Sequence, residues 1–226
     1  VRFGTHWWGI LGLIGWTYLV SALITIFSRN NFYWLLSAWI FFCVLSMVNK
    51  AGLLHGSIFD FIPNAILGGT LPGLTMGGVL TSYVFRYYIE RKDRLKLTII
   101  FLISAVVLIG LSVITRPYWG LAKLGATPAW LFLCSAFTLM AFTLIFWIAD
   151  AWEKSSWFDI IKPAGTDTLL CYLIPYFAYG FVRLTGLTLP DLLLTGGIGL
   201  LKSFSFALLC VLITRGLNAA GIRLRI

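Results

Sequence analysis

Charged residues are scarce in this chain. Only 11% of its 226 residues are Asp, Glu, Lys or Arg, while 60% are hydrophobic and the mean hydropathy is +0.93. A soluble domain is typically about 25% charged and about 45–50% apolar. The composition therefore excludes an ordinary soluble domain. Because lipid offers no partner for an unpaired backbone group, long apolar runs must be helices, and the sequence predicts an all-α, polytopic membrane helical bundle.

Patterns that carry metal or hydrolytic chemistry are also lacking. None of the four cysteines belongs to a CxxC pair, and no GxSxG, HExxH or phosphate-loop pattern stands in a fitting context. We expect the cysteines to be buried small side chains, and we expect no metal site. His6 and His55 stand alone in the sequence, and a lone loop histidine is more often a surface residue than a general base. The sequence alone therefore does not identify a catalytic residue.

Seven apolar runs are long enough to cross a hydrocarbon core about 30 Å thick. They cover residues 7–28, 32–49, 64–89, 96–115, 129–149, 166–184 and 195–217. In the third run, Gly69, Gly73 and Gly77 recur every four residues, and Pro72 is expected to kink or break the helix. Two interpretations stay open, since the glycines either let neighbouring helices pack closely or belong to a broken helix that lines a pocket.

Basic residues outnumber acidic ones, with 17 Lys and Arg against 8 Asp and Glu. Most of the basic residues lie in short connectors beside the apolar runs, which favours lipid headgroups over nucleic acid as their partner. Eleven of the 17 fall on the side shared by the connector after the third run and the C-terminal tail. We therefore expect a cytoplasmic C-terminus.

We expect residues 1–226 to form a single transmembrane helical domain. Residue 1 is Val, and the first apolar run begins only a few residues later. This start predicts that the chain is the C-terminal portion of a longer membrane protein.

Ionisable side chains at both ends of the fifth run make residues 116–172 the strongest candidate for a site. A charged group beside hydrocarbon is costly and is usually retained for function. Arg116 and Lys123 precede the run, and Asp150 ends it. Asp150 is an interfacial cap, a partner for Lys154, or a group that orients a polar ligand at the cytoplasmic mouth, and these interpretations stay open.

A second polar connector opens the sixth run and contains Lys162, Gly165, Thr166 and Asp167. The Asp167 carboxylate could cap the free N–H groups of the first helical turn. The same helix start could instead hold an anionic phosphate, with Gly165 and Thr166 supplying contacts. The residues alone do not decide between capping and phosphate binding.

These motifs resemble those of the transmembrane acyltransferase family that includes heparan-α-glucosaminide N-acetyltransferase. WGLAKLGATPAWLFL is similar to the family's IPxNKxLWTPSxxL loop, and the later stretch is similar to its PxGxNxLxxY motif. The matching positions are Lys123, Thr127, Pro128, Asp150 at the end of the span, Pro163, Gly165 and Tyr172. Asp167 stands where the family has Asn. Two weaker matches extend the resemblance. Asp60 stands at the position of a family Asp, whereas Gly12 and Leu13 stand where the family has a Gln-Arg pair.

The resemblance implies an enzyme that moves an acetyl or acyl group from a cytoplasmic acyl-CoA donor to an amino sugar or envelope glycan across the membrane. It implies acetyl-CoA as the donor, a bacterial inner-membrane location, and a larger bundle whose N-terminal helices are partners of this chain and carry the catalytic histidine. The lipid bilayer is the expected environment. A homodimer is allowed, and no nucleic acid is expected.

The resemblance also implies two sets of site residues. The residues implied for the donor are Lys162, Gly165, Thr166 and Asp167. The residues implied for the substrate are Asp60, Arg116, Lys123 and Asp150. Two other functions stay open from the sequence. One is a transporter or flippase for a polar cell-envelope molecule, with the third span as its gate, and the other is a non-catalytic helical membrane module.

Overall fold

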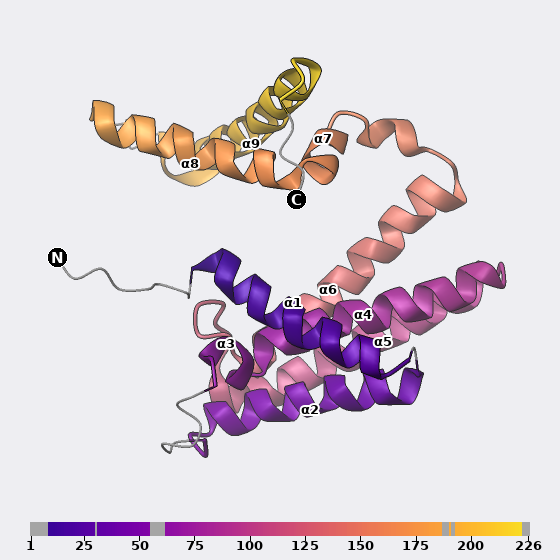
Figure 1. Cartoon of the computed structure of the whole chain (residues 1–226). Coiled ribbons are helices and arrows are strands. Elements are labelled where there is room, and N and C mark those ends of the chain that lie inside the picture. The colour runs from indigo at the N-terminus through magenta and orange to yellow at the C-terminus, as the bar shows by residue number, and fades with distance from the viewer. Residues whose placement is uncertain (1–8, 30, 55–61, 187–189, 191–192, 223–226) are drawn as a thin grey trace. The chain divides into compact units, whose positions relative to one another are not determined.

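The computed structural model describes residues 9–29, 31–54, 62–186, 190 and 193–222 (Figure 1). It is 81% helical, and the residues that it describes contain no strand. The predicted all-α, polytopic helical membrane protein is confirmed. Asp60, His6 and His55 lie outside the described residues.

The helices follow the predicted runs closely. The α-helices are α1 (Ile10–Phe27), α2 (Phe32–Lys50), α3 (Asn64–Leu67), α4 (Thr70–Glu90), α5 (Arg94–Trp119), α6 (Pro128–Phe146), α7 (Lys162–Thr166), α8 (Thr168–Thr185) and α9 (Gly196–Ala219). A π-helical turn, η1 (Trp147–Ala151), extends α6, and a 3-10 turn, η2 (Ser155–Phe158), follows.

Within the described part of the chain, five helices are long and apolar enough to cross a membrane, which supports a lipid bilayer as the environment. They are α2, α5, α6 with η1 (Pro128–Ala151), α8 and α9. The apolar part of α1 is shorter, at Gly12–Phe27. The sequence predicted about seven spans. α4 has 21 residues but does not reach the same hydropathy, because glycine, threonine and tyrosine make up much of it.

The chain divides into two compact units, Val1–Phe146 and Trp147–Ile226. In the first unit, α4 contacts α1, α2, α5 and α6, while α5 and α6 form a closely packed hairpin (Figure 1). In the second unit, α8 packs on α9, and the short α7 contacts both. The single domain over residues 1–226 stays a prediction.

Aromatic and aliphatic side chains form the core of the first unit. Leu35 and Phe42 of α2 and Met76 of α4 are buried together. On the other side of α4, the Phe85 ring lies edge-on to Phe142 and Phe146 of α6, at centroid distances of 5.3 and 5.6 Å. These contacts make α4 the central helix of the unit, so the polar groups at its two ends are held in place by a packed core.

Gly69, Gly73 and Gly77 of the third predicted span form a ridge of small residues, and neighbouring helices pack against this glycine ridge. A Cβ on Gly73 would lie 2.7 Å from the Leu131 side chain of α6, and one on Gly77 would lie 3.4 Å from the Trp39 indole of α2. Gly69 has φ +68°, and a Cβ there would lie 2.6 Å from the Phe42 carbonyl oxygen. The ridge therefore packs helices at all three glycines, while other residues of α4 line a pocket, so each of the two interpretations holds for a different face of this helix.

The third predicted span is broken, but not by its proline. α3 ends at Leu67, and the left-handed backbone of Gly69 redirects the chain into α4. Pro72 lies in the first turn of α4, where a helix has no intrahelical partner for the missing N–H. The break thus precedes Pro72, and the helix beyond it is continuous.

Two of the four cysteines are buried, as the sequence predicted, and the other two are only half-buried. All four are free, with Cys43 and Cys210 buried and Cys134 and Cys171 half-buried. Small thiols of this kind serve as apolar packing groups.

Candidate functional site

The loop that bears Lys123 connects α5 to α6 and is fixed by buried hydroxyl groups. Ser46 of α2 donates to Thr70 of α4 across 2.6 Å, because the Thr70 hydroxyl itself donates to the Ala126 carbonyl oxygen, also at 2.6 Å. Both hydroxyls are almost fully buried, at 0% and 1% exposure. At the other side of the loop, the Thr127 hydroxyl accepts a hydrogen bond from the Ala122 N–H at 3.2 Å.

The same hydrogen bonds hold a strained backbone. Ala126 has φ +44°, in the left-handed region, where a Cβ crowds the following carbonyl oxygen and costs roughly 1–2 kcal/mol. Gly120, at the start of the loop, also has positive φ, at +68°. Strain of this kind persists only where the surroundings over-determine the conformation, and it concentrates at functional positions. The loop is therefore rigid and carries Lys123 in a defined place.

Two of the residues predicted to bind substrate lie at the same end of the α5–α6 hairpin. Lys123 is exposed on this loop, and Arg116 is exposed on the last turn of α5, where its carbonyl oxygen accepts a 2.8 Å hydrogen bond from the Gly120 N–H. The exposed Asp150 lies in η1, beyond the other end of α6, and the 19 residues of α6 span about 28 Å. Lys123 and Asp150 are thus at opposite ends of a membrane-length helix.

The predicted donor residues lie in the second unit, where α7 meets α8. Lys162, Gly165 and Thr166 are exposed on α7, whereas Asp167 is only 7% exposed. The Asp167 carboxylate accepts hydrogen bonds from the Asn218 amide of α9 at 2.7 Å and from the Thr166 hydroxyl at 3.2 Å.

Capping of α8 by Asp167 was one interpretation of the sequence, and it is wrong. Asp167 occupies the position before the first residue of α8, but its side chain makes no cap hydrogen bond. Its backbone, with φ −128° and ψ 55°, turns the chain between α7 and α8, and the carboxylate bonds to α9 instead. Oδ2 of the carboxylate accepts both of these hydrogen bonds, and neither comes from a backbone N–H of α8.

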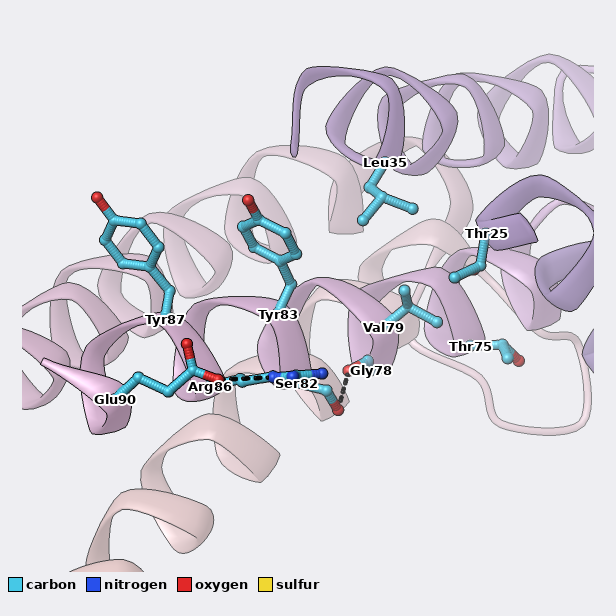
Figure 2. Close-up of a pocket in the computed structure, with 10 residues that line it drawn as sticks. All are labelled: Thr25, Leu35, Thr75, Gly78, Val79, Ser82, Tyr83, Arg86, Tyr87 and Glu90. Carbon is cyan, nitrogen blue, oxygen red and sulfur yellow. Dashed lines mark hydrogen bonds and ion pairs between the residues drawn. The ribbon is translucent and has the colours of Figure 1, made fainter. Parts of the chain in front are cut away.

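A pocket that the sequence analysis missed lies along α4 in the first unit (Figure 2). Its volume is about 670 Å³, within the range of about 300–1,000 Å³ that is usual for small-molecule sites. Its lining residues are Thr25 of α1, Leu35 of α2, and Thr75, Gly78, Val79, Ser82, Tyr83, Arg86, Tyr87 and Glu90 of α4. Gly78, and not the three glycines of the packing ridge, contributes to this pocket.

Charges gather at the end of the pocket where α4 ends and α5 begins. Arg86 and Glu90 form an ion pair at 2.8 Å, and the Arg91 guanidinium lies 3.5 Å from the centroid of the Tyr87 ring. Lys96 pairs with Asp93 at 2.6 Å. The side chains of Arg86 and Glu90 are 76% and 64% exposed, so the pair is accessible to a ligand from water or from the headgroup layer.

A signal for this pocket was present in the sequence. Polar or small residues recur every fourth position along α4, in a helix less apolar than its neighbours. The basic residues that follow α4 predicted only on which side of the membrane this connector lies. Among the described residues, no group of His, Cys, Asp and Glu could hold a metal ion.

Comparison with known proteins found no relative of this chain. No family model matches the chain, and neither the curated proteins nor the solved structures give a match. The resemblance to the transmembrane acyltransferase family therefore stays a prediction that depends on the motifs quoted above.

Proposed function

We propose that this chain is part of a membrane acyltransferase that moves an acetyl or acyl group from an acyl-CoA donor to an amino sugar or envelope glycan on the other side of the bilayer. The observation that carries the proposal is the Lys123 loop. Buried hydroxyls on α2 and α4 hold this loop, and Ala126 keeps a left-handed backbone within it. Rigid, strained loops of this kind position binding groups at functional sites.

Lys123 and Arg116 would position the acceptor. Both are exposed cations at the same end of the α5–α6 hairpin, which is suited to the hydroxyl and carboxylate oxygens of a glycan. Holding the amine of the acceptor in one orientation toward the thioester lowers the entropic part of the barrier. The new bond joins the amine nitrogen to the acyl carbon as the carbon–sulfur bond breaks, and the thiol of the donor leaves. The proton of the amine passes to a base and then to the leaving sulfur, and the resemblance implies that this base is the histidine of the N-terminal helices.

Part of the predicted donor set fits an anionic phosphate. Lys162 supplies an exposed cation, and Gly165 and Thr166 are exposed beside it. Asp167 does not fit, because its carboxylate is buried, carries the same sign of charge as a phosphate, and already bonds to Asn218. In this proposal Lys162 and Thr166 contact the phosphates, while Asp167 stabilises the turn on which they lie. The proposed location is a bacterial inner membrane with a cytoplasmic C-terminus.

The direct test is transfer of a radiolabelled acetyl group from acetyl-CoA to glucosamine by the full-length membrane protein in detergent. We expect label in the amino sugar only when both acetyl-CoA and the protein are present. Replacement of Asp150 by Ala is expected to reduce the transfer rate. Absence of transfer with glucosamine and with envelope glycans would contradict the proposal.

A transporter or flippase is the second candidate, favoured by the discontinuity between α3 and α4. Broken helices often carry the substrate sites of secondary transporters. Here the break is tightly packed, because Gly69 lies against the α2 backbone. Flux of a labelled amino sugar across liposomes without any acyl donor would support this alternative. A protein with neither flux nor transfer would be the non-catalytic helical module.

A further inference from the structure

The α4 pocket is an elongated groove whose polarity changes along its length. One row on α4 reads Thr75, Val79, Tyr83 and Tyr87, and the parallel row reads Gly78, Ser82, Arg86 and Glu90 (Figure 2). Residues four apart lie on the same face of a helix. At 1.5 Å per residue, the groove runs about 22 Å from Thr75 to Glu90. It is small and apolar at one end, and aromatic and charged at the other.

This length and this gradient match an amphiphile that lies along α4. The hydrocarbon core is about 30 Å thick, or about 15 Å per leaflet, so a groove of about 22 Å has room for one acyl chain and a headgroup. Val79 and Leu35 provide apolar walls at the inner end, with Leu35 contributed by α2. Tyr83 and Tyr87 stand where the apolar part gives way to the charged part, as tyrosines do at a membrane boundary.

The charged end carries one group of each sign. The 2.8 Å ion pair joins Nε of Arg86 to Oε1 of Glu90. Within the described part of the chain, this contact leaves the Nη groups of Arg86 and one oxygen of Glu90 for a ligand. The Arg91 guanidinium lies over the Tyr87 ring, and Lys96 pairs with Asp93, so these cations already have partners. A headgroup with a phosphate and an ammonium group complements Arg86 and Glu90.

Three hydroxyl groups of the groove can act only as acceptors toward a ligand. The hydroxyls of Thr25, Thr75 and Ser82 donate to the carbonyl oxygens of Ser21, Leu71 and Gly78 of their own helices, at 2.7, 3.1 and 2.9 Å. With its proton engaged, each hydroxyl presents only lone pairs to the groove. Ser82 lies one turn before Arg86, so it places one of these acceptors on the same row as the ion pair.

We propose that the α4 groove binds an aminophospholipid of the phosphoethanolamine type. Its phosphate binds the Arg86 guanidinium, its ammonium group donates to Glu90, and one acyl chain lies along Val79 toward Thr75. The site is independent of the acyltransferase proposal, since it involves neither the Lys123 loop nor α7. In this proposal, α4 is the helix that recognises a bilayer lipid.

The test uses the chain in nanodiscs with a phosphatidylethanolamine that carries a photoreactive diazirine in its acyl chain. Crosslinked peptides are mapped by mass spectrometry. We expect labelling within residues 75–90, and we expect unlabelled phosphatidylethanolamine to compete at least about fivefold better than phosphatidylcholine. The two lipids carry the same charges, but the choline nitrogen has no N–H to donate.

Matched variants separate the groove from general surface charge. Arg86→Gln is expected to reduce the labelling at least fivefold, and Lys92→Gln, at the same end of α4 but outside the groove, is expected to change it less than twofold. Glu90→Gln should abolish the preference for ethanolamine over choline. Val79→Trp fills the inner end without a change of charge and should also reduce labelling, which covers the case of an Arg86 variant that folds poorly.

Three results would overturn the proposal. The first is labelling spread along all lipid-facing helices with no excess on α4. The second is equal loss in the Arg86 and Lys92 variants, which would indicate attraction by charge alone. The third is complete displacement of the lipid by coenzyme A or inorganic phosphate, which would assign the groove to a water-soluble phosphate compound instead.

Discussion

Asn218 and Asp167 are 51 positions apart, and their side chains share a 2.7 Å hydrogen bond that joins α9 to the turn between α7 and α8. Asp167 is 7% exposed, and its second contact comes from the neighbouring Thr166 hydroxyl. The other amide atom of Asn218, Oδ1, is buried without a hydrogen-bond partner among the described residues. This pair fixes how α7 lies on the rest of the second unit.

Asp167→Ala is expected to destabilise the second unit. The substitution leaves the buried Asn218 amide without its acceptor, which costs about 1–3 kcal/mol. The measurement is the unfolding midpoint in detergent, together with hydrogen exchange in residues 162–170. Asp167→Asn keeps an acceptor oxygen and should lose less stability. Thr168→Ala is the matched control, because its exposed hydroxyl contacts only the Gly165 carbonyl oxygen of the same turn.

If Asp167→Ala and Thr168→Ala proved equally stable, the carboxylate would not be holding the unit together. Asp167 would then be available for another role, and the assignment of its side chain to packing would be wrong.

Thr70→Val is expected to loosen the Lys123 loop. The change removes the hydroxyl that donates to Ala126 and accepts from Ser46, while it keeps nearly the same side-chain volume. Two buried groups lose their partner, so a loss of about 1–3 kcal/mol is expected. Faster amide exchange at residues 122–127 is the specific readout.

Thr81→Val on the same helix provides the control for Thr70→Val. The Thr81 hydroxyl contacts only the Gly77 carbonyl oxygen one turn earlier. Equal amide exchange rates at residues 122–127 in the two variants would show that the hydrogen bonds of Ser46 and Thr70 do not fix the Lys123 loop.

Gly69→Ala and Gly78→Ala are expected to act in opposite directions. At Gly69 a Cβ meets the Phe42 carbonyl oxygen at 2.6 Å in a backbone with φ +68°, so the helices must separate. At Gly78 a Cβ meets nothing within 4 Å, and alanine favours a helix interior over glycine by about 1 kcal/mol. Thermal unfolding should show a large loss of stability for the first variant and a gain of up to about 1 kcal/mol for the second. Tolerance of alanine at position 69 would refute the close packing of α2 on α4.

The helical architecture was predictable because the apolar runs themselves determine it. The run at residues 32–49 became α2, and the run at 195–217 became α9, since any long apolar segment in lipid must satisfy its backbone internally. The break before α4 was expected near Pro72 and occurred at Gly69. A proline in the first turn of a helix destabilises it little. Position 69, in contrast, has a positive φ and lies against the α2 backbone, and only glycine readily adopts that conformation.

The sites were less predictable, because they depend on contacts between distant residues. Lys123 could be identified from its motif, but the hydroxyls that fix its loop come from positions 46 and 70. Asp167 was recognised as important, yet its partner Asn218 lies in a run that gave no reason to single it out. The α4 groove requires α1 and α2 as well, and no local pattern shows which face of α4 they leave open.

The acyltransferase account depends most directly on Lys123. The decisive measurement is acetyl transfer from acetyl-CoA to glucosamine by the full-length protein with Lys123→Ala, compared with Lys50→Ala, an equally exposed lysine at the end of α2. The account predicts a loss of at least about tenfold for Lys123→Ala, corresponding to about 1.4 kcal/mol or more in transition-state stabilisation, and little change for Lys50→Ala. A Lys123→Ala protein that transfers acetyl groups at the unmodified rate would contradict it.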